Sequence, residues 1–274
     1  MQHQNKVILV TGSSTGIGRA TVRRFSREGW NVVATLRNPE GDTELANLPG
    51  VTVVRLDVTD QASSDAAVAT TVRQYGRIDV VLNNAGYGLT GPFEDTDDRQ
   101  IRRQFDTNVF GLMAVCRAVL PVMREQRSGR ILNVSSVGGR MTFPLYSSYH
   151  ATKWAVEGFT ESLQFELTPF GIDAALIEPG AIKTDFYDRS ADRPAARETS
   201  AYGAFKSQLA PHYDAAARRA VSPDRVAAVI LRAATAAKPK LRYAAAGGAS
   251  LMLLMRRLLP EAAFIGLLRA RFAA

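Results

Sequence analysis

The sequence has only one cysteine, Cys116, so no internal disulfide can form and a disulfide-based scaffold is excluded. A lone thiol fits a reducing compartment. The first residues are polar and lead into a short apolar run, without the basic start and apolar core of a signal region. We therefore expect a mature cytoplasmic protein in which Cys116 is a small buried side chain.

Linkers, internal repeats and low-complexity stretches are also absent. Of the 274 residues, 46% are hydrophobic and 22% are charged. A chain of this composition buries enough apolar surface to offset the entropy of ordering, which excludes disorder as its main state. The length suits one large α/β domain or two small ones, and without a linker we expect one domain over residues 1–274.

Acidic residues are scarce only at the C-terminal end. Residues 238–274 hold seven Lys and Arg against Glu261 alone, a net charge of +6, whereas the other residues hold 27 basic and 25 acidic side chains. The total charge of +8 is therefore concentrated in a tail. A nearly neutral body does not suit a protein that coats phosphates, so we expect no nucleic-acid partner.

Apolar, β-branched runs alternate with longer helical stretches, and the runs are apolar throughout. Such runs suit strands that are covered on both faces, and repeated strand–helix–strand units form a parallel sheet with right-handed crossovers. The expected strands are Val7–Val10, Val32–Ala34, Val51–Val54, Ile78–Leu82, Ile131–Val134 and Ile172–Ile177, with a last one in the region 238–274. The pattern predicts a doubly wound α/β fold of the Rossmann type, with a substrate-covering insertion at about residues 185–221.

A glycine-rich turn with Gly12, Gly16 and Gly18 follows the first strand and opens a helix. Glycines allow a tight turn and a close approach of pyrophosphate to backbone N–H groups at the helix N-terminus. The spacing G-x-x-x-G-x-G departs from the common dinucleotide fingerprint, and a plain strand-to-helix turn is the alternative. The position at the first strand–helix junction favours a nucleotide.

The end of the second strand lacks the acidic residue that would bind the ribose 2′-hydroxyl of NAD. It carries Leu36 and Arg37 instead, and the Arg37 guanidinium can pair with the 2′-phosphate of NADP(H). We therefore expect NADP(H) in preference to NAD(H), with a solvated arginine as the alternative. Further candidates for cofactor binding follow the third and fourth strands: Asp57, Val58, Asn84, Ala85 and Gly86.

Tyr149 and Lys153 are four residues apart in a helical stretch and share one face. Ser136 follows the fifth strand, at the edge where parallel sheets bind ligands, and Asn108 lies in a helical segment between the fourth and fifth strands. This set suits carbonyl reduction or its reverse, because a tyrosine whose pKa of about 10 is lowered by a lysine ammonium can exchange the proton. Ser136 would hydrogen-bond the substrate oxygen, and Asn108 would hold a water between Lys153 and solvent. His150 faces differently on the helix, and we expect it to be a packing or surface residue, with a catalytic role as the alternative.

In chain order, these motifs resemble the short-chain dehydrogenase/reductase family in its compact single-domain form, over about residues 6–185. The residues that carry the resemblance are Thr11-Gly12-x-x-x-Gly16-Ile17-Gly18, Asn83-Asn84-Ala85-Gly86, Asn108, Ser136, Tyr149-x-x-x-Lys153 and Pro179-Gly180. The resemblance implies a catalytic tetrad of Asn108, Ser136, Tyr149 and Lys153. It implies cofactor contacts from Gly12, Ser14, Ile17, Asn84, Gly86, Tyr149, Lys153, Pro179, Gly180, Ile182 and Thr184. It also implies a homodimer or homotetramer through the helices that carry Asn108 and Tyr149.

Three stretches are similar to the 17β-hydroxysteroid and retinol dehydrogenase-like branch of that family: Val33–Arg37, Ser136–Met141 and Tyr149–Gly158. This similarity implies NADP(H) and an apolar steroid-, retinoid- or lipid-like substrate. We expect no metal site. Thr15 is not basic, a departure that leaves phosphate recognition to Arg37. The alternatives are a 3-oxoacyl thioester reductase with the same tetrad, and a non-catalytic NADP-binding sensor or scaffold, which would not need Tyr149 beside Lys153.

The tail from Leu251 to Phe272 combines Leu, Met and Phe with four arginines and is interrupted by Pro260. Its charges and this break leave no apolar stretch of about 20 residues, so it cannot span a bilayer. We expect it to fold back on the body or on a sister subunit. The alternative is contact with a membrane surface.

Overall fold

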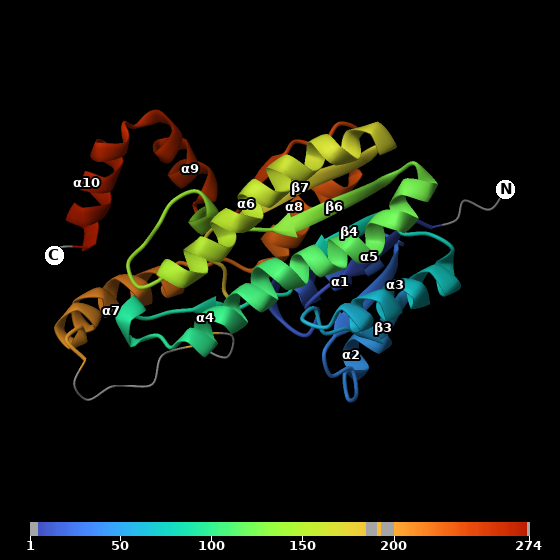
Figure 1. The fold of residues 1–274 in the computed structure, drawn as a ribbon, viewed down its shortest axis with the longest axis horizontal. Coiled ribbons are helices and arrows are strands. Elements are labelled where there is room, and N and C mark those ends of the chain that lie inside the picture. The colour runs from blue at the N-terminus through green and yellow to red at the C-terminus, as the bar shows by residue number, and fades with distance from the viewer. Residues whose placement is uncertain (1–4, 185–190, 193–199, 273–274) are drawn as a thin grey trace.

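The computed structural model describes residues 5–184, 191–192 and 200–272, and its centre is a seven-stranded parallel sheet (Figure 1). The strands span Val7–Val10 (β1), Asn31–Leu36 (β2), Val51–Arg55 (β3), Val80–Asn83 (β4), Gly129–Val134 (β6), Ile172–Pro179 (β7) and Arg242–Ala245 (β9). Their order in the sheet is β3-β2-β1-β4-β6-β7-β9, with every neighbouring pair parallel. The order reverses between β1 and β4, so the predicted doubly wound, Rossmann-type single domain is confirmed.

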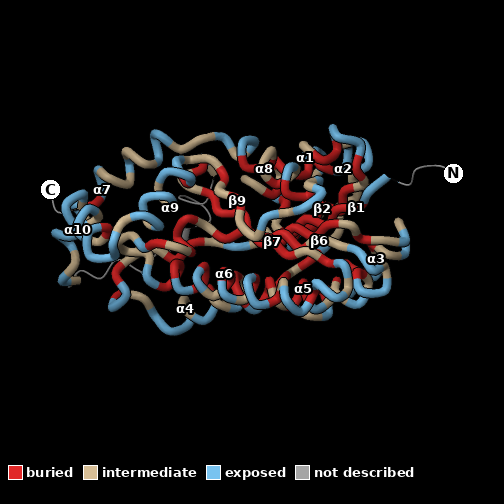
Figure 2. The backbone as a smooth tube through the Cα atoms, turned by 90° about the horizontal axis from the view of Figure 1, so that it is seen from above, coloured by how far each residue is buried: buried red, intermediate tan, exposed pale blue. Residues whose placement is uncertain are grey.

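The strands are apolar along their length because helices cover both faces of the sheet. One face carries α1 (Gly16–Arg27) and α8 (Pro223–Thr235), and the other carries α3 (Gln61–Tyr75), α5 (Gly111–Gln126) and α6 (Ser147–Leu167) (Figure 2). Alternate side chains of β1 join the two buried clusters: Ile8 and Val10 lie in one, Leu9 in the other. The core is therefore two apolar layers, one on each side of the sheet.

Local signals set where several helices begin and end. Asp60 accepts a hydrogen bond from the first turn of α3, and Gly76 ends that helix with φ 72°, in the left-handed region. Asp97 and Gln100 form a capping box at the start of α4 (Asp98–Phe105). A π-helical turn, Asp106–Phe110, then joins α4 to α5. A short helix, α2 (Thr43–Ala46), lies between β2 and β3.

The continuous helical run of residues 98–126 is long and apolar enough to cross a membrane by length and composition alone. Its side chains Leu112, Val115 and Val119 are buried in the cluster that covers the sheet. It is therefore a core helix of this domain. Cys116 is buried in the same helix, as expected, and burial raises the pKa of its thiol to about 12.

The weak periodicity of residues 185–221, the expected substrate-covering insertion, indicates no regular helix. The region nevertheless contains a helix, α7 (Gly203–Arg218), with Pro211 in its interior. Proline is a poor helix residue, which is why the pattern did not indicate this helix. Two two-residue strands, β5 (Gly88–Leu89) and β8 (Ala191–Asp192), pair with each other and are too short to give a periodic signal. Residues 185–190 and 193–199 of the expected substrate cover lie outside the described residues.

The C-terminal tail forms two helices, α9 (Ala249–Leu258) and α10 (Glu261–Phe272). Phe264 of α10 is 2% exposed and packs in a small cluster with Val137 and Met141. The tail therefore folds back on the body, the first of the two arrangements expected from the sequence. Figure 1 shows α9 and α10 beyond the carboxyl end of the sheet, near α7.

Candidate active site

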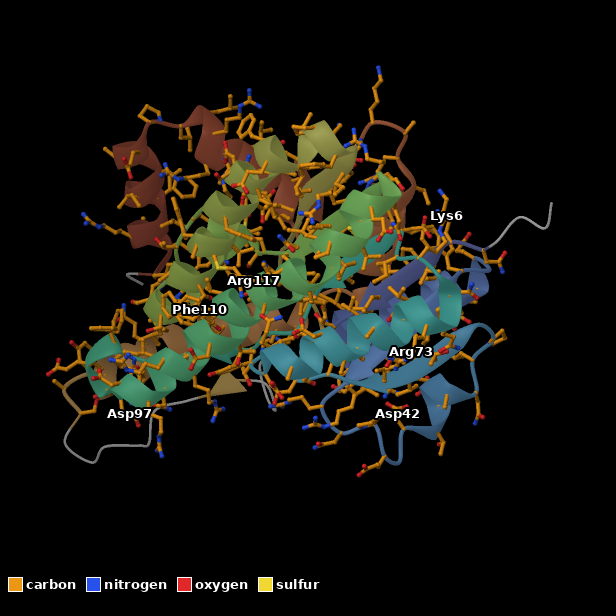
Figure 3. All side chains as sticks on the ribbon, turned by 45° about the vertical axis from the view of Figure 1, so that its right-hand side comes forward. Lys6, Asp42, Arg73, Asp97, Phe110 and Arg117 are labelled. Atoms are coloured by element: carbon orange, nitrogen blue, oxygen red, sulfur yellow. The ribbon has the colours of Figure 1, made fainter. Side chains whose placement is uncertain are left out.

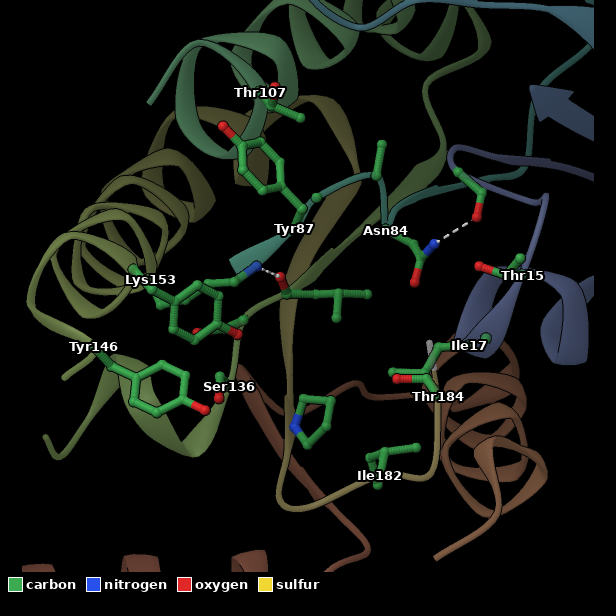
Figure 4. Close-up of a pocket in the computed structure, with 18 of the residues that line it drawn as sticks. Thr15, Ile17, Asn84, Tyr87, Thr107, Ser136, Tyr146, Lys153, Ile182 and Thr184 are labelled. Carbon is green, nitrogen blue, oxygen red and sulfur yellow. Dashed lines mark hydrogen bonds between the residues drawn. The ribbon is translucent and has the colours of Figure 1, made fainter. Parts of the chain in front are cut away.

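A cavity of about 830 Å³ runs along the carboxyl edge of the sheet (Figure 4). It extends from the turn after β1 to the N-terminal half of α6 and on to the tail. Every catalytic and cofactor residue expected from the sequence lines it, except Gly18 and Asn108. Figure 4 shows Ile17 on one side of the cavity, with Ser136 and Lys153 on the other.

Glycines close the turn between β1 and α1. Gly12 has φ 68°, and a Cβ there would lie 2.8 Å from the Cα of Ala85. A Cβ on Gly18 would lie 2.2 Å from the carbonyl oxygen of Gly12, so Gly18 serves the packing of the turn and not the cavity wall. Gly16 and Ile17 line the cavity at the N-terminus of α1, where backbone N–H groups have no partner within the helix. This arrangement suits a pyrophosphate.

Asn84 fixes the segment after β4 against this turn. Its Nδ2 donates to the carbonyl oxygens of Thr11 and Gly12, at 2.9 and 3.0 Å. The Thr11 hydroxyl in turn accepts from the backbone N–H groups of Asn84 and Ala85, both at 3.0 Å. These four hydrogen bonds fix the position of the wall that Ala85 and Gly86 form opposite the glycine turn.

Arg37 and Asp57 line the cavity beyond the ends of β2 and β3. Arg37 is exposed. Burial acts to raise the pKa of Asp57, but hydrogen bonds from Thr59 and the charges of Arg37 and Arg55 outweigh it, and the pKa is lowered. This end of the cavity, which Val58 also lines, therefore offers a guanidinium for a phosphate and a carboxylate for an amino group.

The segment after β7 forms another wall. Its lining residues include Pro179, Gly180, Ile182 and Thr184. Ile182 pairs with Val221 in an isolated parallel bridge, which holds the segment in place. Thr184 lies over Gly16, since a Cβ on that glycine would be 3.1 Å from the Thr184 Cγ2. Ser14 also lines the cavity, in the turn that Thr184 faces.

Tyr149 and Lys153 lie one turn apart on α6, and both are buried residues of the cavity wall. The Lys153 Nζ donates to the carbonyl oxygen of Val134 at 2.8 Å and lies 5.8 Å from the centroid of the Tyr149 ring. Burial lowers the pKa of Lys153 to about 8, and the negative charge of Glu157 opposes that change. The ammonium form therefore prevails at neutral pH and stands beside the Tyr149 ring.

Ser136 lines the cavity, whereas Asn108 does not. Ser136 lines it after β6, and its Oγ accepts from the Gly138 N–H at 3.0 Å. Asn108 is buried in the π-helical turn, where it accepts from the Tyr87 N–H at 3.1 Å and donates to the Tyr87 carbonyl and the Thr152 hydroxyl, at 2.9 and 3.2 Å. It links the segment after β4 to α6, and the water expected at Asn108 stays a prediction.

Aromatic side chains that the sequence motifs did not include complete the far end of the cavity. Tyr146 and Tyr213 have ring centroids 5.5 Å apart, and Tyr213 stacks with Phe272 at 6.3 Å. Met252 of α9 lines the same end. Tyr146 stands directly before α6, three residues before Tyr149, and this nearness to the tyrosine motif is a signal that could have identified it. Phe272 has no such signal, because only the folding of the tail brings it there.

His150 is buried, in keeping with the packing role expected from the sequence. It stacks on Tyr146 with ring centroids 5.7 Å apart, and its Nδ1 accepts from the Phe143 N–H at 3.4 Å. Burial lowers the pKa of His150 to about 4, so the ring is neutral at neutral pH. It lines the cavity as an uncharged wall residue.

These residues fit a nicotinamide dinucleotide. The glycine turn leaves room for two phosphates at a helix N-terminus, and Arg37 and Asp57 suit the adenosine half. The segment after β7 and Lys153 would hold the nicotinamide riboside half near Tyr149.

Comparisons with known proteins agree with this geometry. The family model described as short chain dehydrogenase matches residues 6–195. A 3-ketodihydrosphingosine reductase from Bacteroides thetaiotaomicron is 40% identical over 68% of this chain and 67% of its own length. The 17-beta-hydroxysteroid dehydrogenase type 1 of Mus musculus is 36% identical over 86% of this chain and 72% of its own length. The crystal structure of a short-chain dehydrogenase from Streptomyces avermitilis superposes with a TM-score of 0.82 and 35% identity, covering 100% of this chain and 96% of that one.

Proposed function

Because the chain belongs to the short-chain dehydrogenase family, whose members are oxidoreductases, we propose that it is an NADP(H)-dependent enzyme that interconverts a ketone or aldehyde and its alcohol on an apolar substrate. One observation carries this proposal. Tyr149, Lys153 and Ser136 line the same cavity as the glycine turn after β1. A bound nicotinamide and a proton donor can therefore act on one carbonyl group.

The chain's own residues handle the proton and the developing charge, while the bound nicotinamide supplies the hydride for reduction. The Tyr149 hydroxyl donates its proton to the carbonyl oxygen. Ser136 donates a hydrogen bond to the same oxygen as negative charge develops there. The Lys153 ammonium favours the ionised Tyr149 that remains. Oxidation of the alcohol uses the same groups in reverse.

The preference for NADP(H) depends on the end of β2. Arg37 is an exposed cation that lines the cavity there, and Leu36 stands where an acidic residue would bind an unphosphorylated ribose. A guanidinium can form two charge-assisted hydrogen bonds to a 2′-phosphate. These features support NADP(H) in preference to NAD(H).

The far end of the cavity supports an apolar substrate. Its wall of Tyr146, Tyr213, Met252 and Phe272 offers aromatic and thioether surfaces. The similarity to a 3-ketodihydrosphingosine reductase and to a hydroxysteroid dehydrogenase supports a lipid- or steroid-like ketone. A 3-oxoacyl thioester remains the alternative substrate, because it needs the same catalytic groups.

Exposed aromatic side chains support assembly through the helices that carry Asn108 and Tyr149. Phe110 (Figure 3), Trp154 and Phe165 are all exposed, on or next to α5 and α6. Burial of such side chains favours association, so we propose a homodimer or homotetramer. The free Cys116 thiol supports a cytoplasmic location.

The test is NADPH oxidation by the purified protein over a panel of long-chain ketones, steroids, retinoids and 3-oxoacyl thioesters. We expect the highest kcat/KM for an apolar ketone or aldehyde. A higher kcat/KM for thioesters would establish the alternative substrate. NADPH binding without turnover of any member of the panel would instead identify a non-catalytic sensor or scaffold and reject the enzyme.

A further inference from the structure

Behind the catalytic residues of α6 lies a group of buried charges that the proposed reaction does not use. Glu157 and Glu178 are 4% and 2% exposed. Glu157 follows Lys153 by one turn of α6, and Glu178 is on β7 directly before Pro179 of the cavity wall. Arg242 of the neighbouring strand β9 reaches both carboxyl groups. Two buried acids therefore adjoin the site.

Arg242 connects the carboxylates of this group. Its Nε donates to the Glu157 Oε2 at 2.9 Å, and its Nη2 donates to the Glu161 Oε2 at 2.5 Å. The Glu178 Oε1 lies 3.7 Å from the Arg242 Nε and 3.5 Å from the Arg140 Nη1. Within the part of the chain that the structure describes, the buried Oε1 of Glu157 has no hydrogen-bond partner. The charge of Glu157 is thus only partly compensated by its neighbours.

We propose that Glu157 is a positioning residue for the reaction, because its buried carboxylate is the counter-charge that keeps Lys153 in the ammonium form beside Tyr149. The inference depends on the proposed function, in which Lys153 acts on Tyr149 as a cation. Residues four apart on a helix are neighbours, and an opposite charge stabilises a cation that burial disfavours. Burial indeed lowers the pKa of Lys153, and the charge of Glu157 raises it.

Protonation of Glu178 limits the total negative charge of the two buried residues Glu157 and Glu178. Burial first, and then the charge of Glu157, raises the pKa of Glu178 to about 7. Over the lower part of the neutral range Glu178 therefore holds a proton and adds no second negative charge beside Glu157. Among the described residues, the charged and titratable groups around Glu157 are of two kinds. Lys153, Glu178 and Arg242 interact with Glu157 itself, whereas Arg140 pairs with Glu178 and Glu161 pairs with Arg242.

Glu161 provides a matched control for Glu157. It lies one turn further along α6 and binds the same Arg242. Its side chain is 53% exposed, whereas that of Glu157 is 6% exposed. A substitution at Glu161 removes an ion pair with Arg242 without removing a buried charge next to Lys153.

The test measures the pH midpoint of Lys153 in the full-length, cofactor-free protein. Because Lys153 lines the cavity, the protein is treated with acetic anhydride, and mass spectrometry follows the acetylation rate of Lys153 against pH, with the exposed Lys238 as internal reference. In Glu157→Gln we expect the midpoint to fall by about one pH unit, whereas in Glu161→Gln it stays at the wild-type value. Arg242→Gln removes a positive charge from the group and should raise the midpoint.

Opposite shifts of the Lys153 midpoint in Glu157→Gln and Arg242→Gln are the signature of a charge effect, because loss of packing would move the midpoint in the same direction in both variants. An unchanged midpoint in Glu157→Gln, or shifts of one sign in both variants, overturns the inference. If Glu157→Gln does not fold, the sign of the shift in Arg242→Gln decides. Turnover is not part of this measurement, so failure of the proposed reaction is observed separately, in the wild-type protein.

Discussion

The Nζ of Lys153 on α6 donates a hydrogen bond to the backbone carbonyl of Val134 on β6, 2.8 Å away (Figure 4). Ser136 follows two residues after Val134, so one contact ties α6 to the strand end that carries the serine. Lys153 also stands beside Tyr149. The groups proposed to handle the proton are therefore held together by the fold itself.

Tyr149→Phe should abolish turnover and leave cofactor affinity nearly unchanged, because the substitution removes only the hydroxyl that exchanges the proton. Fluorescence titration with NADPH and steady-state kinetics measure the two effects. Lys153→Ala should weaken both binding and turnover, since it removes a cation that would contact the ribose and that favours ionised Tyr149. A Tyr149→Phe enzyme with most of its activity would mean that another group donates the proton.

Leu36→Asp combined with Arg37→Ala should move cofactor preference toward NAD(H). The change supplies an acceptor for the ribose hydroxyl and removes the partner of the 2′-phosphate. Losing a charged hydrogen-bond partner costs about 1.5–3 kcal/mol, which corresponds to roughly a tenfold to hundredfold loss in affinity for NADP(H). The ratio of kcat/KM with NADPH to that with NADH measures the effect, and an unchanged ratio contradicts the role of Arg37.

Glu178→Gln should make the protein more stable than wild type above neutral pH. The folded-state pKa of Glu178, about 7, exceeds its ordinary value of 4.5 because of burial and then the charge of Glu157. A group with a raised folded-state pKa contributes stability that is complete below the unfolded value and is lost as pH rises through the folded value. Because glutamine does not titrate, the variant does not lose this stability as pH rises. Its free energy of unfolding relative to wild type should therefore increase between pH 5 and pH 8 by on the order of 1–3 kcal/mol.

Urea unfolding over a pH series measures this difference, and Glu161→Gln is the control. The pKa of Glu161 is lowered by its hydrogen bond and charge interaction with Arg242, the opposite direction, so its substitution should bring no gain at alkaline pH. A stability difference for Glu178→Gln that is constant with pH would show that Glu178 does not titrate in this range.

Phe264→Ala should destabilise the protein by about 3 kcal/mol, because it removes a buried aromatic ring that fastens α10 to the body. Leu267→Ala is the matched control, since Leu267 is on the same helix and 54% exposed. Thermal or urea unfolding gives both values. Equal effects would mean that α10 does not pack on the body in solution.

A chain that ends at Gly248 should melt at a lower temperature than the full chain, and neither should sediment with anionic vesicles. Leu251, Leu254 and Leu258 remain exposed on α9, which makes the vesicle measurement necessary. Salt-sensitive sedimentation of the full chain that truncation abolishes would support contact of the tail with a lipid surface.

Phe165→Glu and Trp154→Glu should lower the molar mass measured by light scattering, because they place charge on the proposed subunit contact. Phe93→Glu is the control, since Phe93 is 62% exposed but lies outside α5 and α6. An oligomer that all three variants leave intact would place the subunit contact elsewhere.

The sequence by itself determined the sheet, the glycine turn and the candidate site residues that line the cavity, and the family resemblance it predicted is confirmed. The reason is that these signals are local. Uninterrupted apolar runs predict strands buried on both faces, and in a parallel sheet every polar motif at the end of a strand lies on the same edge. Ser136 and Arg37 therefore reach one cavity although the sequence separates them widely.

The tertiary structure alone decided what surrounds those motifs. Phe272 stacks on Tyr213 only because the tail folds back over α7. The packing role of Gly18 follows from its close contact with the carbonyl oxygen of Gly12 in the folded turn. Arg242 binds Glu157, 85 positions earlier in the chain, because β9 adds to the sheet beside β7. Contacts between such distant residues depend on how helices and strands pack, which no local periodicity encodes.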